Sequence, residues 1–555
     1  MIDKINITTD LLVIGNGLAG IRSAQAAAQK GINVVVVSKG MSASPEVMGF
    51  NAVVSPDDSV DSYYNDIIRS GKGINNKKVA RVLAEGASDE VIYLEKLGLA
   101  FDKNPDGSYH TLHTLGCDHP RLVHCKAITG VEARRILVND AKKNGVKFMQ
   151  HVMITELILN KKCIAGAVGL EMTGNLVIFF RCKAVVLATG GCGDIYDVST
   201  YPSGIVGDGY AIAFRAGAEL IDMEFQQYEP CCFVYPKVMR GRLIPTTLFR
   251  SGAKLLNGSV GEFIDKYGLT RNNVQKSDLS RAIAMEILEG RGTEHGGVYY
   301  DMTMLPRDLV VVNHSIFYNP ALKAGIDLTK QKAEVAPAAH TSLGGIRIDE
   351  YGSTTVKGLF AAGEVTGGVH GSNRIGGCAG AETLVFGGKA GESAAVYVKN
   401  EELISEKEFN DNLKIEIEKI IYRQAGDEKG SKVAYIRRKL AQIMTEKAGI
   451  VRNGKVLSEA MEELEKMRKT LSEIRVNSSR KLAALYQCEN SVLTAQMQIK
   501  ASMVRTESRG VFFRTDYPEQ RDQIWMKNII IQWKNGKMEA TIKACNGCGG
   551  GGEQW

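Results

Sequence analysis

The N-terminal segment carries the pattern that most constrains the fold. Residues 9–14 form a short apolar stretch that runs into Gly15-x-Gly17-x-x-Gly20, and an alanine-rich segment and a second apolar stretch, residues 33–37, follow. This order predicts a strand, a tight turn, a helix and a second strand, with a pyrophosphate bound by backbone N–H groups at the helix N-terminus. We therefore expect a dinucleotide site that includes Gly15, Gly17, Leu18, Ala19 and Gly20.

Three other segments carry distinctive residues in a fixed order. Ser38-Lys39 ends the second predicted strand, where NAD-binding domains usually carry an acidic residue for the ribose. Residues 183–191 form an apolar strand that ends in the sequence ATGG. Residues 340–388 combine many glycines with His340, Glu364, His370 and Arg374, in an order that turns alone do not require. Together these segments resemble the fumarate reductase/succinate dehydrogenase flavoprotein family, which includes L-aspartate oxidase.

The resemblance implies FAD as the cofactor. The family carries Ser-Lys after the second strand, so the missing acidic residue favours FAD over NAD. Membrane-bound members attach FAD through a histidine shortly after that strand; residues 38–45 contain none, so non-covalent FAD is expected. By resemblance, the cofactor site also includes Ser38, Lys39, Ala188, Thr189, Gly190, Asp208, Gly363, Glu364, Arg374, Ala379 and Gly380.

The same resemblance implies the chemistry of the site. In the family a hydride passes between flavin N5 and one carbon of a double bond, while an arginine exchanges a proton with the neighbouring carbon. His340 and Arg374 match the segments that hold the conjugated carboxylate, and a planar guanidinium can hold it with two parallel hydrogen bonds. His370 opens the segment that contains Arg374 and is a further candidate.

The match breaks at the residues that define the family's activity. Glu229 stands where the family carries a substrate-binding histidine, and Lys276 stands where it carries the proton-shuttling arginine. Thr246 replaces the first acid of the family's Thr-Glu-x-x-Arg-Gly-Glu segment, whereas Arg281 keeps the second arginine of the shuttle motif. A desolvated lysine can act as an acid or base, so Lys276 is a candidate proton donor. The alternative is a surface lysine on a capping helix.

Glu229 leaves three interpretations open. The substrate could carry one carboxylate at His340 and Arg374 and a hydroxyl, amide or ammonium near Glu229. Glu229 could instead accept the proton that Lys276 delivers. In the third interpretation Glu229 is turned away and stabilises the capping domain. The first two argue against an ordinary fumarate or succinate site, because a second carboxylate would meet a like charge.

Composition excludes several other classes of protein. The chain has 555 residues and a formal net charge of +7, and no basic run with interleaved aromatic residues is found, so no nucleic-acid partner is expected. No apolar run approaches the length of a membrane span, and no signal peptide is visible. Eleven scattered cysteines favour reduced thiols in the cytoplasm. The pair Cys545-x-x-Cys548 lacks a second pair, so no metal site is expected.

The positions of the motifs predict the domain organisation. We expect an α/β protein whose Rossmann-like FAD-binding domain is interrupted by an α+β capping domain and followed by a C-terminal helical domain. Apolar residues recur at helical spacing in residues 433–448 and 457–474, and residues 480–506 form a third candidate helix. The expected bounds are 1–235 and 335–400 for the FAD-binding domain, 236–334 for the capping domain, 401–510 for the helical domain and 511–555 for a C-terminal extension.

The sequence thus predicts a soluble FAD-dependent oxidoreductase that acts on a carbon–carbon bond next to a carboxylate, with a small carboxylate as substrate. One alternative is amine oxidation of the L-aspartate oxidase kind. Another is an electron-transfer flavoprotein subunit that works with an iron–sulfur partner. The sequence names neither the substrate nor the electron partner, and it leaves an oligomer open.

Overall fold

The expected strand–helix–strand unit is present in the computed structural model, which describes residues 3–114, 116–126, 128–174, 176–271, 274–426 and 431–545. Strand β2 (Leu11–Ile14) leads through the glycine turn into α1 (Leu18–Ala28), and β3 (Val34–Ser38) follows. Every residue of both strands is buried, as a sheet covered on both faces requires. They lie in a five-stranded parallel sheet of order β18-β11-β2-β3-β7, completed by β18 (Leu359–Ala361), β11 (Ala184–Leu187) and β7 (Lys147–Gln150).

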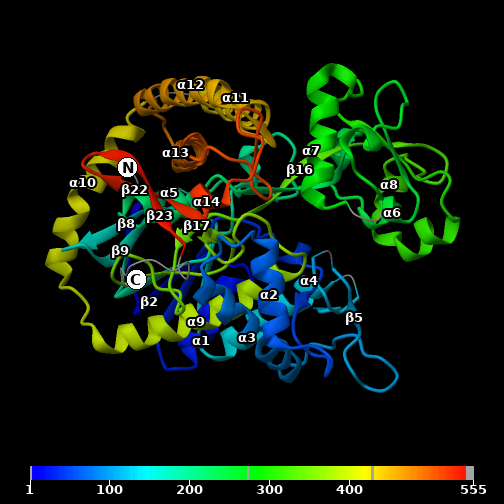
Figure 1. The fold of residues 1–555 in the computed structure, drawn as a ribbon. Helices are drawn as coiled ribbons and strands as arrows, with labels where there is room; N and C mark the ends of the chain where they lie inside the picture. Colours follow the sequence, from blue (N-terminus) through cyan, green and yellow to red (C-terminus); the bar gives the residue numbers. More distant parts are fainter. Residues whose placement is uncertain are drawn as a thin grey trace.

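Helix α9 (Cys378–Asn400) packs closely against α1 (Figure 1). Glycines make this approach feasible, because a Cβ atom at Gly391 would lie 2.2 Å from the carbonyl oxygen of Ser23, and one at Gly387 would lie 2.9 Å from that of Ala19. The packing fixes the N-terminal end of α9 relative to the glycine turn. Other helices of this layer are α2 (Val60–Ser70), α3 (Lys77–Lys96) and α4 (Thr129–Lys143).

A second sheet, of order β1-β10-β9-β8, lies beside the first and shares its hydrophobic core. Its strands β9 and β10 are almost wholly buried. The segment after this sheet leads through β11 to α5 (Asp208–Arg215), whose first residue was predicted to belong to the cofactor site. The strands are β1 (Asp3–Thr8), β8 (Val152–Asn160), β9 (Cys163–Glu171) and β10 (Leu176–Arg181).

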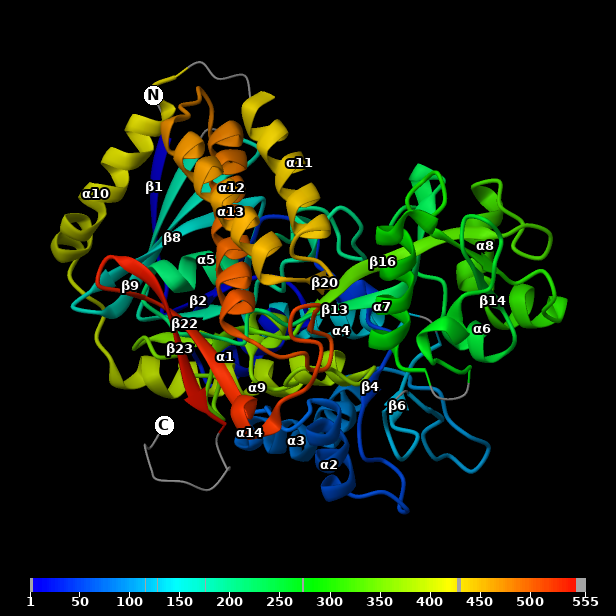
Figure 2. The ribbon, with the colours of Figure 1, turned by 45° about the horizontal axis from the view of Figure 1, so that its top comes forward.

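The capping segment forms a separate lobe with its own hydrophobic core (Figure 1). Two long antiparallel strands, β13 (Gln226–Tyr235) and β16 (Ala333–Ser342), run from the main body into this lobe (Figure 2). The two strands therefore carry their residues directly from the flavin-binding body to the cap. The other elements of the lobe are α6 (Thr247–Arg250), β14 (Lys254–Leu256), α7 (Lys276–Glu286), β15 (Val298–Asp301) and α8 (Ser315–Lys323).

The predicted helices of the C-terminal part are present. Helix α11 (Ser431–Glu446) and α12 (Gly454–Glu473) pack on α13 (Ser479–Val504), and the preceding α10 (Glu406–Gln424) begins with a capping box at Ser405. Helix α13 buries residues on all sides, which explains why its sequence shows weak amphipathic periodicity.

The segment after residue 510 is more than an extension. Strand β22 (Lys527–Lys534) pairs with β12 (Leu220–Ile221), and β23 (Lys537–Ala544) pairs with β22, so the hairpin completes a five-stranded sheet. The apolar run at residues 529–531 is buried there. Cys545 is buried, and Cys548 lies outside the described residues. The sheet also contains β17 (Gly345–Arg347) and β19 (Thr366–Gly367).

Small elements complete the fold, including α14 (Asp522–Trp525), the pair β20 (Val451–Arg452) and β21 (Phe513–Arg514), and the sheet of β4 (Phe50–Asn51), β5 (Thr111–Leu112) and β6 (Leu122–Val123). Among the described helices none combines the length and the apolar character needed to cross a membrane. Within the same residues no group of three or more His, Cys, Asp or Glu side chains is placed to hold a metal ion.

Candidate functional site

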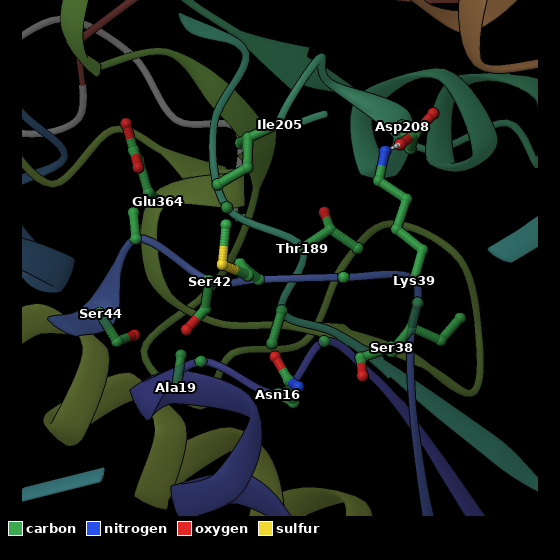
Figure 3. A pocket seen from close by; sticks show the side chains of 18 of the residues that line it. Asn16, Ala19, Ser38, Lys39, Ser42, Ser44, Thr189, Ile205, Asp208 and Glu364 are labelled. Carbon is green, nitrogen blue, oxygen red and sulfur yellow. Dashed lines mark hydrogen bonds and ion pairs between the residues drawn. The ribbon is translucent and has the colours of Figure 1, made fainter. Parts of the chain in front are cut away.

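A deep cavity opens at the carboxyl ends of β2, β3 and β11, beside the N-terminus of α1 (Figure 3). Its empty volume is about 1170 Å³. This is the position at which open α/β sheets bind their ligands. The predicted cofactor residues that line it are Gly15, Gly17, Leu18, Ala19, Ser38, Lys39, Ala188, Thr189, Gly190, Asp208, Glu364 and Ala379.

Two glycines of the predicted motif are required by close backbone contacts. Gly15 has φ 121°, and a Cβ atom there would lie 2.1 Å from the carbonyl oxygen of Ala188. A Cβ atom on Gly20 would lie 2.0 Å from the carbonyl oxygen of Gly15, so Gly20 supports the turn from below and does not line the cavity. The motif thus holds the N-terminus of α1 at the cavity wall, where a phosphate group can approach it.

Lys39 and Asp208 form an ion pair at one end of the cavity, opposite Glu364 (Figure 3). Asn490 Nδ2 donates a hydrogen bond of 2.8 Å to the other oxygen of Asp208. An acidic side chain, absent from the end of β3, is thus present at the cavity on the first residue of α5. The glycine turn, the helix N-terminus and this carboxylate fit the phosphate and sugar parts of a dinucleotide.

Several lining segments were not predicted from the sequence. They are Asn16 and residues 40–44, 152–154 and 204–207. The glycines at 204 and 207 have φ values of 96° and 88°, and this Gly-x-x-Gly spacing was a usable signal for a cofactor loop. No histidine is among the residues that line the cavity in the described part of the chain.

A second group of polar residues gathers on β13 and around it. Gln227 and Glu229 are two residues apart on β13, and the pairing of this strand with β16 shifts register just after each of them. Gln227 Oε1 accepts a hydrogen bond of 3.1 Å from Arg374 Nε, and Lys276 Nζ lies 2.6 Å from Glu229 Oε2. Gln227 therefore holds Arg374, and Glu229 holds Lys276. Gln227 itself was not predicted as a site residue, although it opens the motif that contains Glu229.

Glu229 is buried, with 2% of its surface exposed. Burial pushes the pKa of its carboxyl upward, but the charges of Lys276, His340 and Arg374 outweigh this effect, and the pKa is lowered overall. The carboxylate is thus held in its charged form. Lys276 is the first residue of α7, and its side chain is one-third exposed, so it is neither a free surface lysine nor a buried one.

His340 lies on β16, the partner strand of β13, and its Nδ1 is 3.0 Å from Thr200 Oγ1. Loss of contact with water lowers the pKa of the ring to about 4; Glu229 opposes this effect, whereas Arg374 and Lys276 add to it. The imidazole is therefore neutral near pH 7 and can act as a hydrogen-bonding group.

Glu364 connects this group with the cavity. It lines the cavity, accepts a hydrogen bond of 2.8 Å from the backbone N–H of Ser342, and is also bonded to the hydroxyl of Tyr201. Burial raises the pKa of Glu364 to about 7. Ser342 is two residues from His340, and Tyr201 follows the threonine that contacts His340. The polar group on β13 and β16 therefore adjoins the cofactor cavity.

Other predicted residues lie elsewhere. His370 is buried against Glu382, with Nε2 2.9 Å from Oε2, inside the layer of α9. Arg281 contacts Asp278 at 3.4 Å and stacks on the ring of Phe513, and Thr246 occupies the N-cap position of α6. Gly363 and Gly380 adjoin lining residues without lining the cavity themselves, and Arg374 belongs to the group on β13.

The fold and the cavity define the class of FAD-binding proteins, and comparisons with known proteins agree. The family model described as FAD binding domain matches residues 10–379, and the model described as fumarate reductase flavoprotein C-term matches residues 437–546. The chain belongs to the fumarate reductase/succinate dehydrogenase flavoprotein family. Members of this family are FAD-dependent oxidoreductases.

Individual relatives cover almost the whole chain. One subunit of the fumarate reductase (CoM/CoB) of Methanothermobacter marburgensis is 36% identical over 543 residues, which cover 96% of this chain and 97% of the relative. L-aspartate oxidase of Yersinia pestis is 30% identical over 531 residues, which cover 92% and 96%. The solved structure of E. coli quinol fumarate reductase FrdA superposes with a TM-score of 0.89 at 25% identity and covers 97% of each chain.

Proposed function

We propose that the protein uses non-covalently bound FAD to reduce or form a carbon–carbon bond adjacent to a carboxylate. The observation that carries this proposal is the state of Arg374. Its guanidinium is held by the neutral amide of Gln227 and by the carbonyl oxygen of Ile375, at 3.1 Å each, and it makes no ion pair within the described residues. An oriented guanidinium without an acidic partner, next to a cofactor cavity, is suited to bind a carboxylate.

The chain's own residues provide binding and proton transfer. Arg374 binds the substrate carboxylate, and neutral His340 donates or accepts a hydrogen bond beside it. These groups stabilise negative charge that develops on the conjugated carboxylate. FAD, when bound, supplies the electron pair. Lys276 holds the proton that is exchanged with the second carbon, and Glu229 fixes the position of its ammonium group.

Two features support non-covalent FAD and a protein electron partner. Within the described residues the cavity lining contains no histidine that could carry a covalent link. One relative is named as a subunit of a larger enzyme, so we include an iron–sulfur electron-transfer partner in the proposal. Co-purification under native conditions, followed by iron analysis of the associated chains, tests for that partner.

Reoxidation of the reduced flavin tests the reaction itself. The holoprotein is reduced with dithionite under anaerobic conditions, and unsaturated carboxylates are added while the flavin absorbance is recorded. The proposal expects rapid return of the oxidised spectrum with stoichiometric formation of the saturated acid. If no unsaturated carboxylate reoxidises the flavin, and L-aspartate with oxygen instead yields peroxide and iminoaspartate, amine oxidation replaces the proposed reaction. The measurement with L-aspartate and oxygen is included because the chain is similar to L-aspartate oxidases.

A further inference from the structure

We infer that the substrate is a monocarboxylate whose other end is uncharged. This inference rests on the proposed function, because it assumes that Arg374 binds the substrate carboxylate. It goes further in assigning a chemical class to the part of the substrate that reaches the capping lobe.

The side chains of Lys276, Glu229, Arg374 and His340 together set the charge that a substrate meets. Lys276 and Glu229 are 2.6 Å apart and neutralise each other. Arg374 donates a hydrogen bond to the neutral amide of Gln227. In the part of the chain that the structure describes, no carboxylate in an ion pair neutralises the charge of Arg374 as Glu229 neutralises that of Lys276. His340 is neutral near pH 7, because the loss of solvation lowers its pKa to about 4. These four side chains together therefore carry one net positive charge, which matches one carboxylate, and the adjoining Glu364 is mostly uncharged below its pKa of about 7.

Strand β13 carries both residues that hold the cations. Gln227 and Glu229 lie two residues apart on the strand, and they hold Arg374 and Lys276 respectively. The strand runs from the main body toward the capping lobe (Figure 2), and Gln227 precedes Glu229 along it, so Gln227 is nearer the end of the strand in the main body. Burial raises the pKa of Glu229, and the charges of Lys276 and Arg374 both lower it, so both cations lie near this carboxylate, and we place the far end of a substrate held by Arg374 at the ion pair.

A second carboxylate on the substrate would be costly. A charged far end would either lie beside the carboxylate of Glu229 or draw Lys276 away from it. The first arrangement places like charges together, and the second leaves a buried carboxylate without its cation. An ester, amide, hydroxyl or alkyl group at the far end avoids both costs. It can still accept a hydrogen bond from the ammonium group of Lys276 when it carries an oxygen.

Two matched ligand pairs isolate the charge. Monomethyl succinate and succinate differ by one negative charge, and neither can react while the flavin is kept reduced under anaerobic conditions, because reduced flavin cannot accept a hydride from a saturated acid. Their dissociation constants are measured by flavin absorbance and by calorimetry. We expect the monoester to bind on the order of tenfold more tightly, the effect of about one unfavourable charge contact. Monomethyl fumarate and fumarate then compare turnover in the same way.

One variant should reverse the preference. Glu229→Gln leaves Lys276 as a second uncompensated cation, so the preference for the monoester should disappear or change to the dicarboxylate. Glu286→Gln is the matched control, because Glu286 is a buried carboxylate on the same helix as Lys276 that pairs instead with Lys266 and Arg291. The control should keep the wild-type preference.

The outcomes separate this inference from the proposed function. Equal or tighter binding of succinate by the wild type overturns the inference, even if fumarate is reduced and the proposed reaction is correct. Failure of both ligands to bind overturns it as well. A clear preference for the monoester in binding, together with no reoxidation by any unsaturated carboxylate, supports the charge assignment while rejecting the proposed reaction. A preference that does not change in Glu229→Gln contradicts the role given to the ion pair.

Discussion

Lys276 and Glu229 form an ion pair, 2.6 Å between Nζ and Oε2, that joins the capping lobe to the strand leading from the cofactor domain. The two residues occupy positions at which the sequence departs from the family's motifs. Their contact places the two departures side by side, as a carboxylate and an ammonium group that neutralise each other. Variants of these two residues can therefore distinguish an effect on substrate binding from an effect on proton transfer.

The first prediction concerns that separation. In Lys276→Met/Glu229→Gln both charges are removed, so the net charge of the pair stays at zero. The dissociation constant of monomethyl succinate should therefore change little, whereas turnover should fall by about 10²–10⁴, the usual contribution of a positioned acid or base. Steady-state kinetics and flavin titration measure the two quantities. Glu229→Gln alone keeps the lysine but loses the carboxylate that fixes its position, so its turnover should lie between that of the wild type and that of the double variant. Near-normal turnover in the double variant would show that Lys276 does not carry the proton, and Arg240, Arg242 and Arg281 would then be the candidate donors.

The second prediction is a pH dependence of stability. The folded-state pKa of Glu229 is lowered: burial raises it, but Lys276, His340 and Arg374 lower it more. The wild-type carboxyl thus contributes stability above its unfolded pKa of about 4.3, and that contribution is lost as pH falls through the folded value. Without Lys276 less positive charge opposes the effect of burial, so the folded-state pKa of Glu229 should be higher in Lys276→Met than in the wild type. The variant should therefore lose stability as pH rises and the buried carboxyl is forced to ionise.

At pH 7 Lys276→Met should lower the free energy of unfolding by about 3 kcal/mol, which is the lower end of the range for breaking a buried ion pair. Calorimetric unfolding midpoints of wild type and variant are compared at about pH 4.5 and at about pH 7. Between these values the carboxyl of Glu229 in the unfolded chain goes from about half ionised to fully ionised. The gap between wild type and variant should widen with pH. The double variant with Glu229→Gln should recover most of the loss. A gap of constant size at both pH values would show that Glu229 is not the group responsible.

The third prediction concerns the carboxylate contact. Arg374→Ala should weaken binding of monomethyl succinate and slow turnover together, by about 2–5 kcal/mol, much of it from the unpaired carboxylate. Arg374→Lys restores the charge without the planar pair of donors, so it should recover only part of the affinity. Arg307→Ala, which removes an exposed arginine of the capping lobe, serves as the control. Unchanged affinity in Arg374→Ala would remove the foundation of the proposed function.

The fourth prediction tests the glycine turn. Gly15→Ala places a Cβ atom 2.1 Å from the carbonyl oxygen of Ala188 at a residue with φ 121°, so the turn must move and FAD content should fall sharply. Gly31→Ala is a matched control for backbone strain, because Gly31 has φ 81° and open space around its Cβ position. That control should lose only about 1 kcal/mol of stability and keep its FAD. The flavin-to-protein absorbance ratio distinguishes the two. Full FAD occupancy in Gly15→Ala would contradict the close contact.

The fifth prediction concerns the attachment of FAD. Acid precipitation of the holoprotein should release all the flavin into the supernatant, because the cavity is lined by no histidine within the described residues. Absorbance of the supernatant and of the redissolved pellet measures the two fractions. A pellet that stays yellow after repeated washing would demonstrate a covalent link.

Local sequence patterns were enough to identify the cofactor turn and the main elements around it. Gly15 and Gly20 are recognised by their spacing together with the apolar strand before them and the helix after them, because all three are contiguous in the chain. The long helices of the C-terminal part were also predictable, since their apolar periodicity is local. In contrast, the C-terminal hairpin was not expected to complete a sheet, because its partner strand lies some 300 residues earlier, as the pairing of Ile531 with Leu220 shows.

The pairing of the charges, by contrast, required the tertiary structure. Lys39 meets Asp208 across 169 positions, Lys276 meets Glu229 across 47, and Arg374 meets Gln227 across 147. Each residue type was visible in the sequence, but whether a cation is neutralised depends on which side chain the fold places beside it. Electrostatic energy falls with distance in space and is indifferent to distance along the chain. For that reason the sequence identified the chemical groups of this site, and the fold determined which charge remains available to a substrate.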